Sequence, residues 1–263
     1  MLTFISDNTA PGSTAKHAVL LLHAFPLSAA MWQPQIDALC KAGFTVIAPN
    51  AFGIDGSLEK ESWSFTDYAH ELSNLLDSLK IEKATVVGLS MGGYQAFEFY
   101  RLYPEKTASL VLCDTRAEAD APEARTTREE FIKAVNSAGA EDAIRRMIPN
   151  YFTAATYTTR PELVEHVRNI IRKQPAKVIT EAMRAIMMRT DASPLLSTIH
   201  CPVLVLAGDD DKATPPEINR SISSRIPGAQ FRLLADAGHI SNMEQPEEFN
   251  RALLDHIEKV RIK

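Results

Sequence analysis

The chain has 263 residues, of which 45% are hydrophobic and 23% charged, close to the averages of globular proteins. This composition excludes disordered and fibrous classes, and no apolar run is long enough to cross a bilayer as a helix. The formal net charge of −5, with no block of consecutive Lys and Arg, argues against nucleic acid as a partner. A single α/β domain is the simplest organisation at this length.

The N-terminal residues predict one short strand at residues 2–5, followed by a turn that includes Asn8, Pro11 and Gly12. A secretory signal peptide would have a basic start and a long apolar stretch, and residues 1–13 have neither. We therefore expect a cytoplasmic protein that does not associate with membranes.

Short runs rich in Val, Ile and Leu recur along the rest of the chain and predict strands. They are almost continuously apolar instead of alternating, which is typical of strands buried on both faces. Segments with helical spacing lie between them, for example at residues 65–79 and 94–103. This alternation predicts an α/β fold with a mostly parallel sheet and helices on both faces. The predicted strands are residues 18–23, 44–48, 84–88, 110–113, 203–207 and 231–234.

One interval, residues 114–197, contains only helical patterns and predicts an insertion between two strands. Prolines divide this interval, because proline fits the first turn of a helix but disrupts its interior. The predicted helices are residues 123–136, 141–148, 162–173 and 176–188. We expect residues 1–113 and 198–263 to form the core domain that carries this insertion.

The stretch from Gly88 to Gly92 has the pattern Gly-x-Ser-x-Gly, directly after a predicted strand and before a predicted helix. A nucleophile elbow has this pattern in this context. Its sharp turn needs small residues two positions before and after the serine, because neighbouring backbone passes close to the turn. The motif alone arises often by chance, but the strand and helix around it make it specific. Ser90 is therefore the candidate nucleophile.

A serine hydroxyl needs a base to accept its proton and a further group to orient that base. His239 follows the last predicted strand in Ala-Gly-His, where a loop at the carboxyl edge of the sheet would place it above Ser90. The other histidines lie in or beside predicted helices and strands, where packing and surface roles suit them. We predict that His239 is the base.

Three consecutive carboxylates, Asp209, Asp210 and Asp211, follow the strand predicted at residues 203–207. One of them must turn inward to the imidazole of His239. The spacing favours Asp211 and leaves the other two as solvated turn residues. Asp114, at the end of an earlier predicted strand, is an alternative acid.

An oxyanion hole needs two backbone N–H groups, one from the residue after the nucleophile and one from a loop after an early strand. Met91 and Phe25 occupy these two positions. Further candidates could line a substrate pocket, although Met and aromatic residues at helical spacing more often serve packing. These pocket candidates are Trp32, Tyr151, Phe152 and Met187.

The three cysteines, Cys40, Cys113 and Cys201, are odd in number and widely spaced. This arrangement fits neither a disulfide framework nor a zinc site. We expect them to be structural.

Taken together, four stretches resemble the α/β-hydrolase superfamily: His-Ala-Phe-Pro at 23–26, Gly-Leu-Ser-Met-Gly-Gly at 88–93, Gly-Asp-Asp-Asp at 208–211 and Gly-His at 238–239. The order Ser, Asp, His is the order of that superfamily. Within it, the chain looks like the capped esterases and enol-lactone hydrolases such as 3-oxoadipate enol-lactonase, including Leu-Cys-Asp-Thr at 112–115. Some members carry the acid at the strand end where Asp114 stands.

The resemblance implies that residues 114–197 form a helical cap and that the protein cleaves a small carboxylic ester or lactone through an acyl-enzyme. It implies no metal and no organic cofactor. The chain departs from the family at Ala24, where glycine is usual, and in the loop at 49–53, which lacks a common arginine. The alternatives are an enol-lactone hydrolase, a cofactor-free perhydrolase and, from another class, a non-catalytic ligand receptor. A dehalogenase of this fold would have a carboxylate at position 90.

Overall fold

The computed structural model describes residues 1–7 and 16–261, so the turn predicted from Asn8 to Gly12 lies outside the described residues. Within them a seven-stranded sheet has the order β1-β3-β2-β4-β5-β6-β7, parallel except for β1, which runs antiparallel to β3. The α/β prediction is therefore confirmed. The strands are β1 (Phe4–Asp7), β2 (His17–Leu22), β3 (Val46–Pro49), β4 (Lys83–Leu89), β5 (Thr107–Cys113), β6 (Val203–Gly208) and β7 (Gln230–Leu234).

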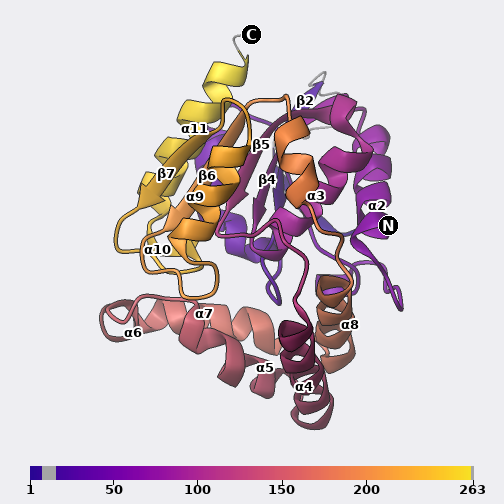
Figure 1. The fold of residues 1–263 in the computed structure, drawn as a ribbon, viewed down its shortest axis with the longest axis vertical. Coiled ribbons are helices and arrows are strands. Elements are labelled where there is room, and N and C mark those ends of the chain that lie inside the picture. Colours follow the sequence, from indigo (N-terminus) through magenta and orange to yellow (C-terminus); the bar gives the residue numbers. More distant parts are fainter. Residues whose placement is uncertain (8–15, 262–263) are drawn as a thin grey trace.

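The central strands are buried along almost their whole length, as their apolar runs predict. Such strands need helices on both faces, because each face would otherwise expose Val, Ile and Leu to water. Helices α2, α3 and α9 cover one face, and α1 and α11 pack on the other (Figure 1). Their bounds are α1 (Gln33–Lys41), α2 (Phe65–Ser78), α3 (Met91–Leu102), α9 (Pro216–Arg225) and α11 (Pro246–Arg261), with the short α10 (Ser241–Glu244) before the last.

The insertion between β5 and β6 folds into helices that gather as a layer below the sheet in Figure 1. All four predicted helices are present with ends shifted by a few residues. The short α6 was not predicted, because its sequence Thr-Tyr-Thr-Thr has no apolar periodicity. The helices are α4 (Pro122–Ala138), α5 (Ala140–Met147), α6 (Thr156–Thr159), α7 (Pro161–Arg172) and α8 (Ala176–Met187).

Short 3₁₀ turns connect several of these elements. One of them, η1, follows the loop after β2, and η4 leads from α5 toward α6. No helix among the described residues is long and apolar enough to cross a membrane. The 3₁₀ turns are η1 (Ala29–Trp32), η2 (Ile54–Gly56), η3 (Pro104–Lys106), η4 (Ile148–Asn150) and η5 (Ser193–Thr198).

The two ends of the insertion are joined by a buried arginine, Arg189, just after α8. Its guanidinium donates to the carbonyl of Glu118 and pairs with Asp120 at 2.7 Å. Asp120 also pairs with Arg128 on α4, so this buried carboxylate is neutralised from two sides. The same guanidinium lies 4.5 Å from the ring centre of Tyr94 on α3. These contacts hold both ends of the insertion together and against α3, the helix that follows Ser90.

Candidate active site

Ser90 lies in the sharp turn between β4 and α3, with φ +56° and ψ −112°. A side chain strains the backbone at a positive φ, and neighbouring structure must hold such a turn in place. The N–H of Ser90 donates to the Cys113 carbonyl at 2.9 Å, and its carbonyl accepts the hydroxyl of Thr115 at 2.8 Å. The end of β5 therefore fixes the turn from both sides.

The glycines on either side of Ser90 leave no room for a side chain. A Cβ on Gly88 would lie 2.2 Å from the carbonyl oxygen of Gly92, and a Cβ on Gly92 would lie 2.0 Å from that of Leu22. Both contacts are with backbone atoms, which cannot turn aside as a flexible side chain can. The Gly-x-Ser-x-Gly spacing is thus a packing requirement of this turn.

The structure brings Ser90, His239 and Asp211 together, although they lie far apart in the sequence. The Nε2 atom of His239 is 2.8 Å from the Oγ of Ser90. Its Nδ1 atom is 3.0 Å from Oδ1 and 2.9 Å from Oδ2 of Asp211. An imidazole whose Nδ1–H donates to a carboxylate has a free lone pair at Nε2, which can accept the serine proton.

Asp211 is held in the turn after β6 by its own neighbours. Its Oδ1 accepts the N–H groups of Ala213 and Thr214 at 2.8 and 2.9 Å, and its Oδ2 accepts the Thr214 hydroxyl at 2.6 Å. Burial alone would raise the pKa of Asp211, but attraction to His239 and these hydrogen bonds together lower it. The carboxylate therefore stays ionised beside the imidazole.

Asp114, the alternative acid, lies close by but has other partners. Its Oδ1 accepts the N–H of Gly208 at 2.8 Å, and its Oδ2 accepts the hydroxyl of Ser241. Burial, and then the negative charge of Asp211, raise the pKa of Asp114 well above its usual range. Among the described residues, the carboxylate hydrogen-bonded to the His239 ring is that of Asp211.

The loop after β2 is ordered by a buried histidine, His23. Its Nε2 accepts the N–H of Ala51 at 3.0 Å, which leaves Nδ1 to donate to the Ala24 carbonyl at 2.9 Å. Burial lowers the pKa of His23 to about 4, so the ring is neutral in this arrangement. The Ala24 carbonyl and the Phe25 N–H belong to one planar peptide unit, so His23 also fixes the direction of that N–H.

The two predicted oxyanion donors come from different segments: Met91 follows Ser90 in the chain, and Phe25 lies in the loop after β2. Met91 is the first residue of α3, where helix geometry leaves the N–H groups without intrahelical partners. Within the part of the chain that the structure describes, no acceptor bonds to the backbone N–H of Phe25 or of Met91. Both groups are thus available to stabilise a negative oxygen.

Comparison with known proteins gives the family. The family model of the α/β-hydrolase fold matches residues 17–246. The chain belongs to the α/β-hydrolase family. The structure of a thermophilic esterase from Thermogutta terrifontis superimposes with a TM-score of 0.92 at 36% identity, covering 98% of this chain and 93% of that one.

Other relatives in this family are named for different activities. The 3-oxoadipate enol-lactonase 1 of Acinetobacter baylyi is 28% identical over 88% of this chain and 85% of its own length. A protein of Mycobacterium tuberculosis named as a non-heme bromoperoxidase is 28% identical over 88% of this chain and 89% of its own. The enol-lactonase of Burkholderia xenovorans superimposes with a TM-score of 0.88 at 27% identity, over 98% and 96% of the two chains.

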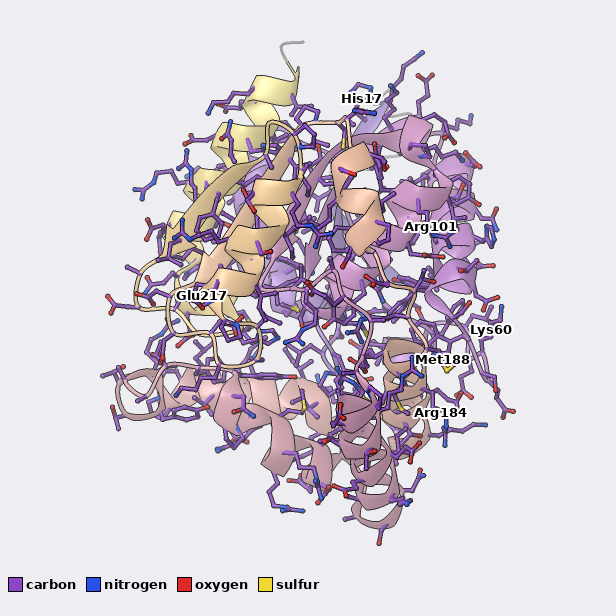
Figure 2. The ribbon with its side chains drawn as sticks, in the orientation of Figure 1. His17, Lys60, Arg101, Arg184, Met188 and Glu217 are labelled. Carbon is purple, nitrogen blue, oxygen red and sulfur yellow. The ribbon has the colours of Figure 1, made fainter. Side chains whose placement is uncertain are left out.

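The pocket candidates of this α/β-hydrolase lie in different surroundings. Trp32 is fully buried and packs on Phe249 of α11, with ring centres 6.0 Å apart. Phe152 is buried in the insertion, and Met187 is half-buried at the end of α8. Figure 2 labels the next residue, Met188, which is 76% exposed. A substrate-lining role for Trp32, Phe152 and Met187 stays a prediction.

Tyr151 is the pocket candidate that contacts the residues around Ser90 most directly. Its ring centre lies 5.8 Å from that of His239, with an angle of 31° between the planes. Its hydroxyl donates to the Phe25 carbonyl, and its own carbonyl accepts the N–H of Ile240 at 3.1 Å. One residue of the insertion therefore contacts both the loop after β2, which carries Phe25, and the loop that carries His239.

Glu244 in α10 is a buried residue of this region that the sequence did not single out. Its Oε1 accepts the Thr153 N–H at 2.9 Å and the Thr156 hydroxyl at 2.6 Å, and its Oε2 accepts the Gly238 N–H at 2.6 Å. A glutamate beside Gln-Pro-Glu-Glu is typical of an exposed helix start, so the sequence holds no signal for this role. Thr214, also missed, could have been found as the partner three residues after Asp211.

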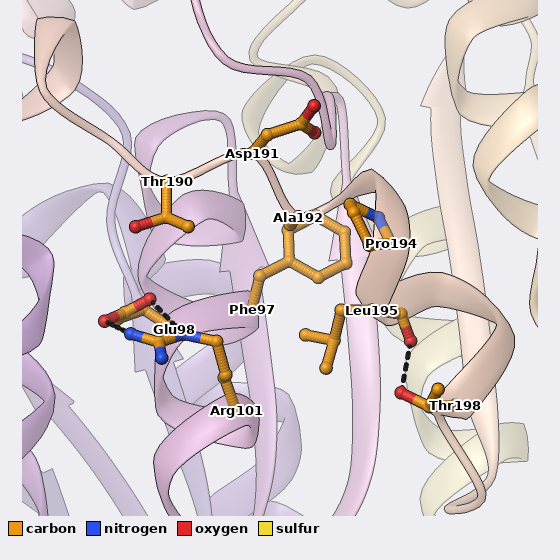
Figure 3. Close-up of a pocket in the computed structure, with 9 residues that line it drawn as sticks. All are labelled: Phe97, Glu98, Arg101, Thr190, Asp191, Ala192, Pro194, Leu195 and Thr198. Carbon is orange, nitrogen blue, oxygen red and sulfur yellow. Dashed lines mark hydrogen bonds and ion pairs between the residues drawn. The ribbon is translucent and has the colours of Figure 1, made fainter.

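A cavity of about 280 Å³ lies beside α3, between Phe97, Glu98, Arg101 and the segment at 190–198 (Figure 3). Arg101 donates to the Glu98 carboxylate there, so these two charges satisfy each other. Neither Ser90 nor His239 lines this cavity. We therefore treat it as separate from the candidate active site.

Proposed function

We propose that this protein is a serine hydrolase that cleaves a small carboxylic ester or lactone through an acyl-enzyme. The observation that carries the proposal is the continuous hydrogen-bonded path from Ser90 Oγ through the His239 ring to Asp211. The Thermogutta terrifontis esterase, at 36% identity over 98% of this chain, supports the same reaction class.

In the first half of the reaction, the Oγ of Ser90 attacks the substrate carbonyl carbon while Nε2 of His239 accepts its proton. The carbonyl oxygen becomes negative and accepts hydrogen bonds from the N–H groups of Phe25 and Met91. His239 then gives the proton to the leaving alcohol, and the acyl group remains on Ser90. Asp211 holds the imidazole in the required tautomer and stabilises its positive form.

In the second half, water replaces the alcohol. His239 accepts a proton from water as the water oxygen attacks the acyl carbon, and it returns that proton to Ser90 when the acid leaves. In a lactone the leaving alcohol stays attached to the acyl group and departs with it. Each half consumes and releases one proton, so the resting state is restored.

We further propose that residues 114–197 act as a cap that bounds the substrate site. Support comes from contacts between this segment and the loop after β2. The Phe131 ring of α4 lies edge-on to Phe25 at 5.8 Å, and Tyr151 bonds to the Phe25 carbonyl. Both contacts keep bulk water from one side of the oxyanion loop.

Turnover of a p-nitrophenyl ester series, from acetate to octanoate, tests the proposal. Wild type should hydrolyse the short esters, and Ser90→Ala should lose at least about 10⁴-fold in kcat. Ser224→Ala is the matched control, because this exposed serine on α9 bonds through its hydroxyl to the Ser221 carbonyl. It should retain wild-type turnover.

An inert wild type that binds small esters would favour a non-catalytic receptor. The enol-lactonase and bromoperoxidase relatives supply two narrower candidates within the hydrolases. A small enol-lactone, and acetate with hydrogen peroxide, should therefore be assayed beside the ester series. The substrate with the highest kcat/KM then assigns the chain to one of these activities.

A further inference from the structure

We propose that Tyr151 is a positioning residue of the oxyanion hole, holding the Phe25 backbone in place through its hydroxyl. This inference rests on the proposed function and adds a residue from the insertion to the machinery. The observation behind it is that the hydroxyl donates to the Phe25 carbonyl from a side chain that is 1% exposed.

Phe25 is flanked by two peptide units, and each has its own anchor. The preceding unit is fixed through the Ala24 carbonyl, which accepts Nδ1–H of His23 and the N–H of Leu27, both at 2.9 Å. The following unit carries the Phe25 carbonyl, which accepts the Tyr151 hydroxyl. With both planes held, the torsions at Phe25 and the direction of its N–H are fixed.

Tyr151 can serve as an anchor because its own backbone is firmly attached. Its carbonyl accepts the N–H of Ile240, directly after His239. Two residues later, Thr153 bonds to the Glu244 carboxylate through both its N–H and its hydroxyl. Arg160 donates to the carbonyls of Met243 and Glu244. The segment that carries Tyr151 is therefore bound to the loop of His239 at several points.

The hydroxyl is suited to act as a permanent donor. Burial raises the pKa of Tyr151 well above its usual range, so the phenol keeps its proton throughout the working pH range. Removing the Tyr151 hydroxyl would leave the Phe25 carbonyl without this hydrogen-bond partner inside a buried loop. Only the preceding peptide unit would then be held, so the loop could shift as a whole and carry the Phe25 N–H away from the position where negative charge develops.

Tyr151→Phe removes the hydroxyl and keeps the ring. We expect kcat for p-nitrophenyl acetate to fall between roughly tenfold and a hundredfold, with KM within about twofold of wild type. A trifluoromethyl ketone, which forms a tetrahedral adduct with a reactive serine, should lose affinity by the same factor as kcat/KM.

Tyr157→Phe is the matched control, since Tyr157 in α6 also donates its hydroxyl to a backbone carbonyl, that of Ile148. Its loss should cost similar stability and leave kcat and inhibitor affinity unchanged. A purely structural role for Tyr151 would make the two variants behave alike, with lower melting temperatures and wild-type kcat.

The two proposals fail in different ways. If wild type hydrolyses the ester, Ser90→Ala does not, and Tyr151→Phe has wild-type kcat and inhibitor affinity, the role of Tyr151 is overturned and the serine-hydrolase function stands. If wild type is inert toward every ester and every lactone, both are overturned.

Discussion

Replacing Asp211 by asparagine would change one atom of the carboxylate that faces His239. In the protein Oδ1 accepts two backbone N–H groups, and Oδ2 accepts the Thr214 hydroxyl, while both oxygens lie within 3.0 Å of Nδ1 of His239. The asparagine oxygen would keep the two backbone bonds. Its NH₂ group would then occupy the Oδ2 position and face Nδ1.

An NH₂ group in that position favours the tautomer in which Nδ1 accepts and Nε2 carries the proton. Such a ring presents a hydrogen to the Oγ of Ser90 and cannot accept one from it. Substitution of the acid by its amide in a Ser-His-Asp triad lowers kcat by about 10⁴-fold, or roughly 5.5 kcal/mol of transition-state stabilisation. We expect a loss of that order for Asp211→Asn, with KM little changed.

Asp114→Asn is the matched control, because it makes the same atomic change in a neighbouring buried side chain. Burial raises the pKa of Asp114 well above its usual range, so the surroundings disfavour a charge there and asparagine removes none that they stabilise. Its oxygen can still accept the Gly208 N–H. We expect kcat within about tenfold of wild type. The assay is initial-rate hydrolysis of p-nitrophenyl acetate by folded, purified variants. If Asp114→Asn is the less active of the two, Asp211 is not the acid that orients His239.

Three further predictions concern stability. Burial first, and then Lys259, lower the pKa of His256 to about 4. Between about pH 6.5 and 4 the His256 ring is therefore protonated in the unfolded state and neutral in the folded one, so lowering the pH from 7 to 5 costs about 2 kcal/mol of stability. His256→Leu should remove this loss, as measured by urea unfolding at the two pH values. An unchanged dependence of the unfolding free energy on pH would contradict this. Gly92→Ala should lower the unfolding free energy by roughly 3 kcal/mol or prevent folding, because its Cβ would lie 2.0 Å from a backbone oxygen, and a wild-type urea midpoint would rule out the clash. Glu244→Gln should cost about 1–3 kcal/mol and lower kcat, because its amide group would face the N–H of Gly238, and unchanged stability and turnover would argue against that pairing.

Much of the fold could be predicted from the sequence because local patterns determine it. Buried parallel strands need continuous apolar runs, and these appear in β2, β4, β5 and β6. The turn at Ser90 needs glycine at 88 and 92, since any Cβ would meet backbone atoms. Requirements of this kind can be recognised directly in the sequence.

The placement of Asp211 could be expected for a similar reason. Among the three adjacent carboxylates, Asp210 lies 3.8 Å from Lys212 at the surface, and Asp209 accepts the N–H of Ala237. Asp211 is the one that points inward to His239. Asp209 and Asp210 are both exposed and only Asp211 is buried, so the position of each carboxylate in the turn after β6 decides which one meets His239.

The contacts of Tyr151 and Glu244 could not be predicted, because they depend on how distant segments pack. Tyr151 lies 126 residues from Phe25, and Glu244 lies 91 residues from Thr153. Neither stands in a motif, and both are residue types that occur widely at surfaces. The burial of Trp32 against Phe249 likewise follows from the meeting of η1 with α11.

Peptide mapping after reaction with a fluorophosphonate tests most directly whether the chain is a serine hydrolase that acts through Ser90. We expect one phosphonyl group per chain, on the peptide that carries Ser90, with esterase activity lost in proportion to labelling. Ser90→Ala should remain unlabelled. Label on another residue, or full esterase activity in a completely labelled protein, would show that Ser90 is not the nucleophile.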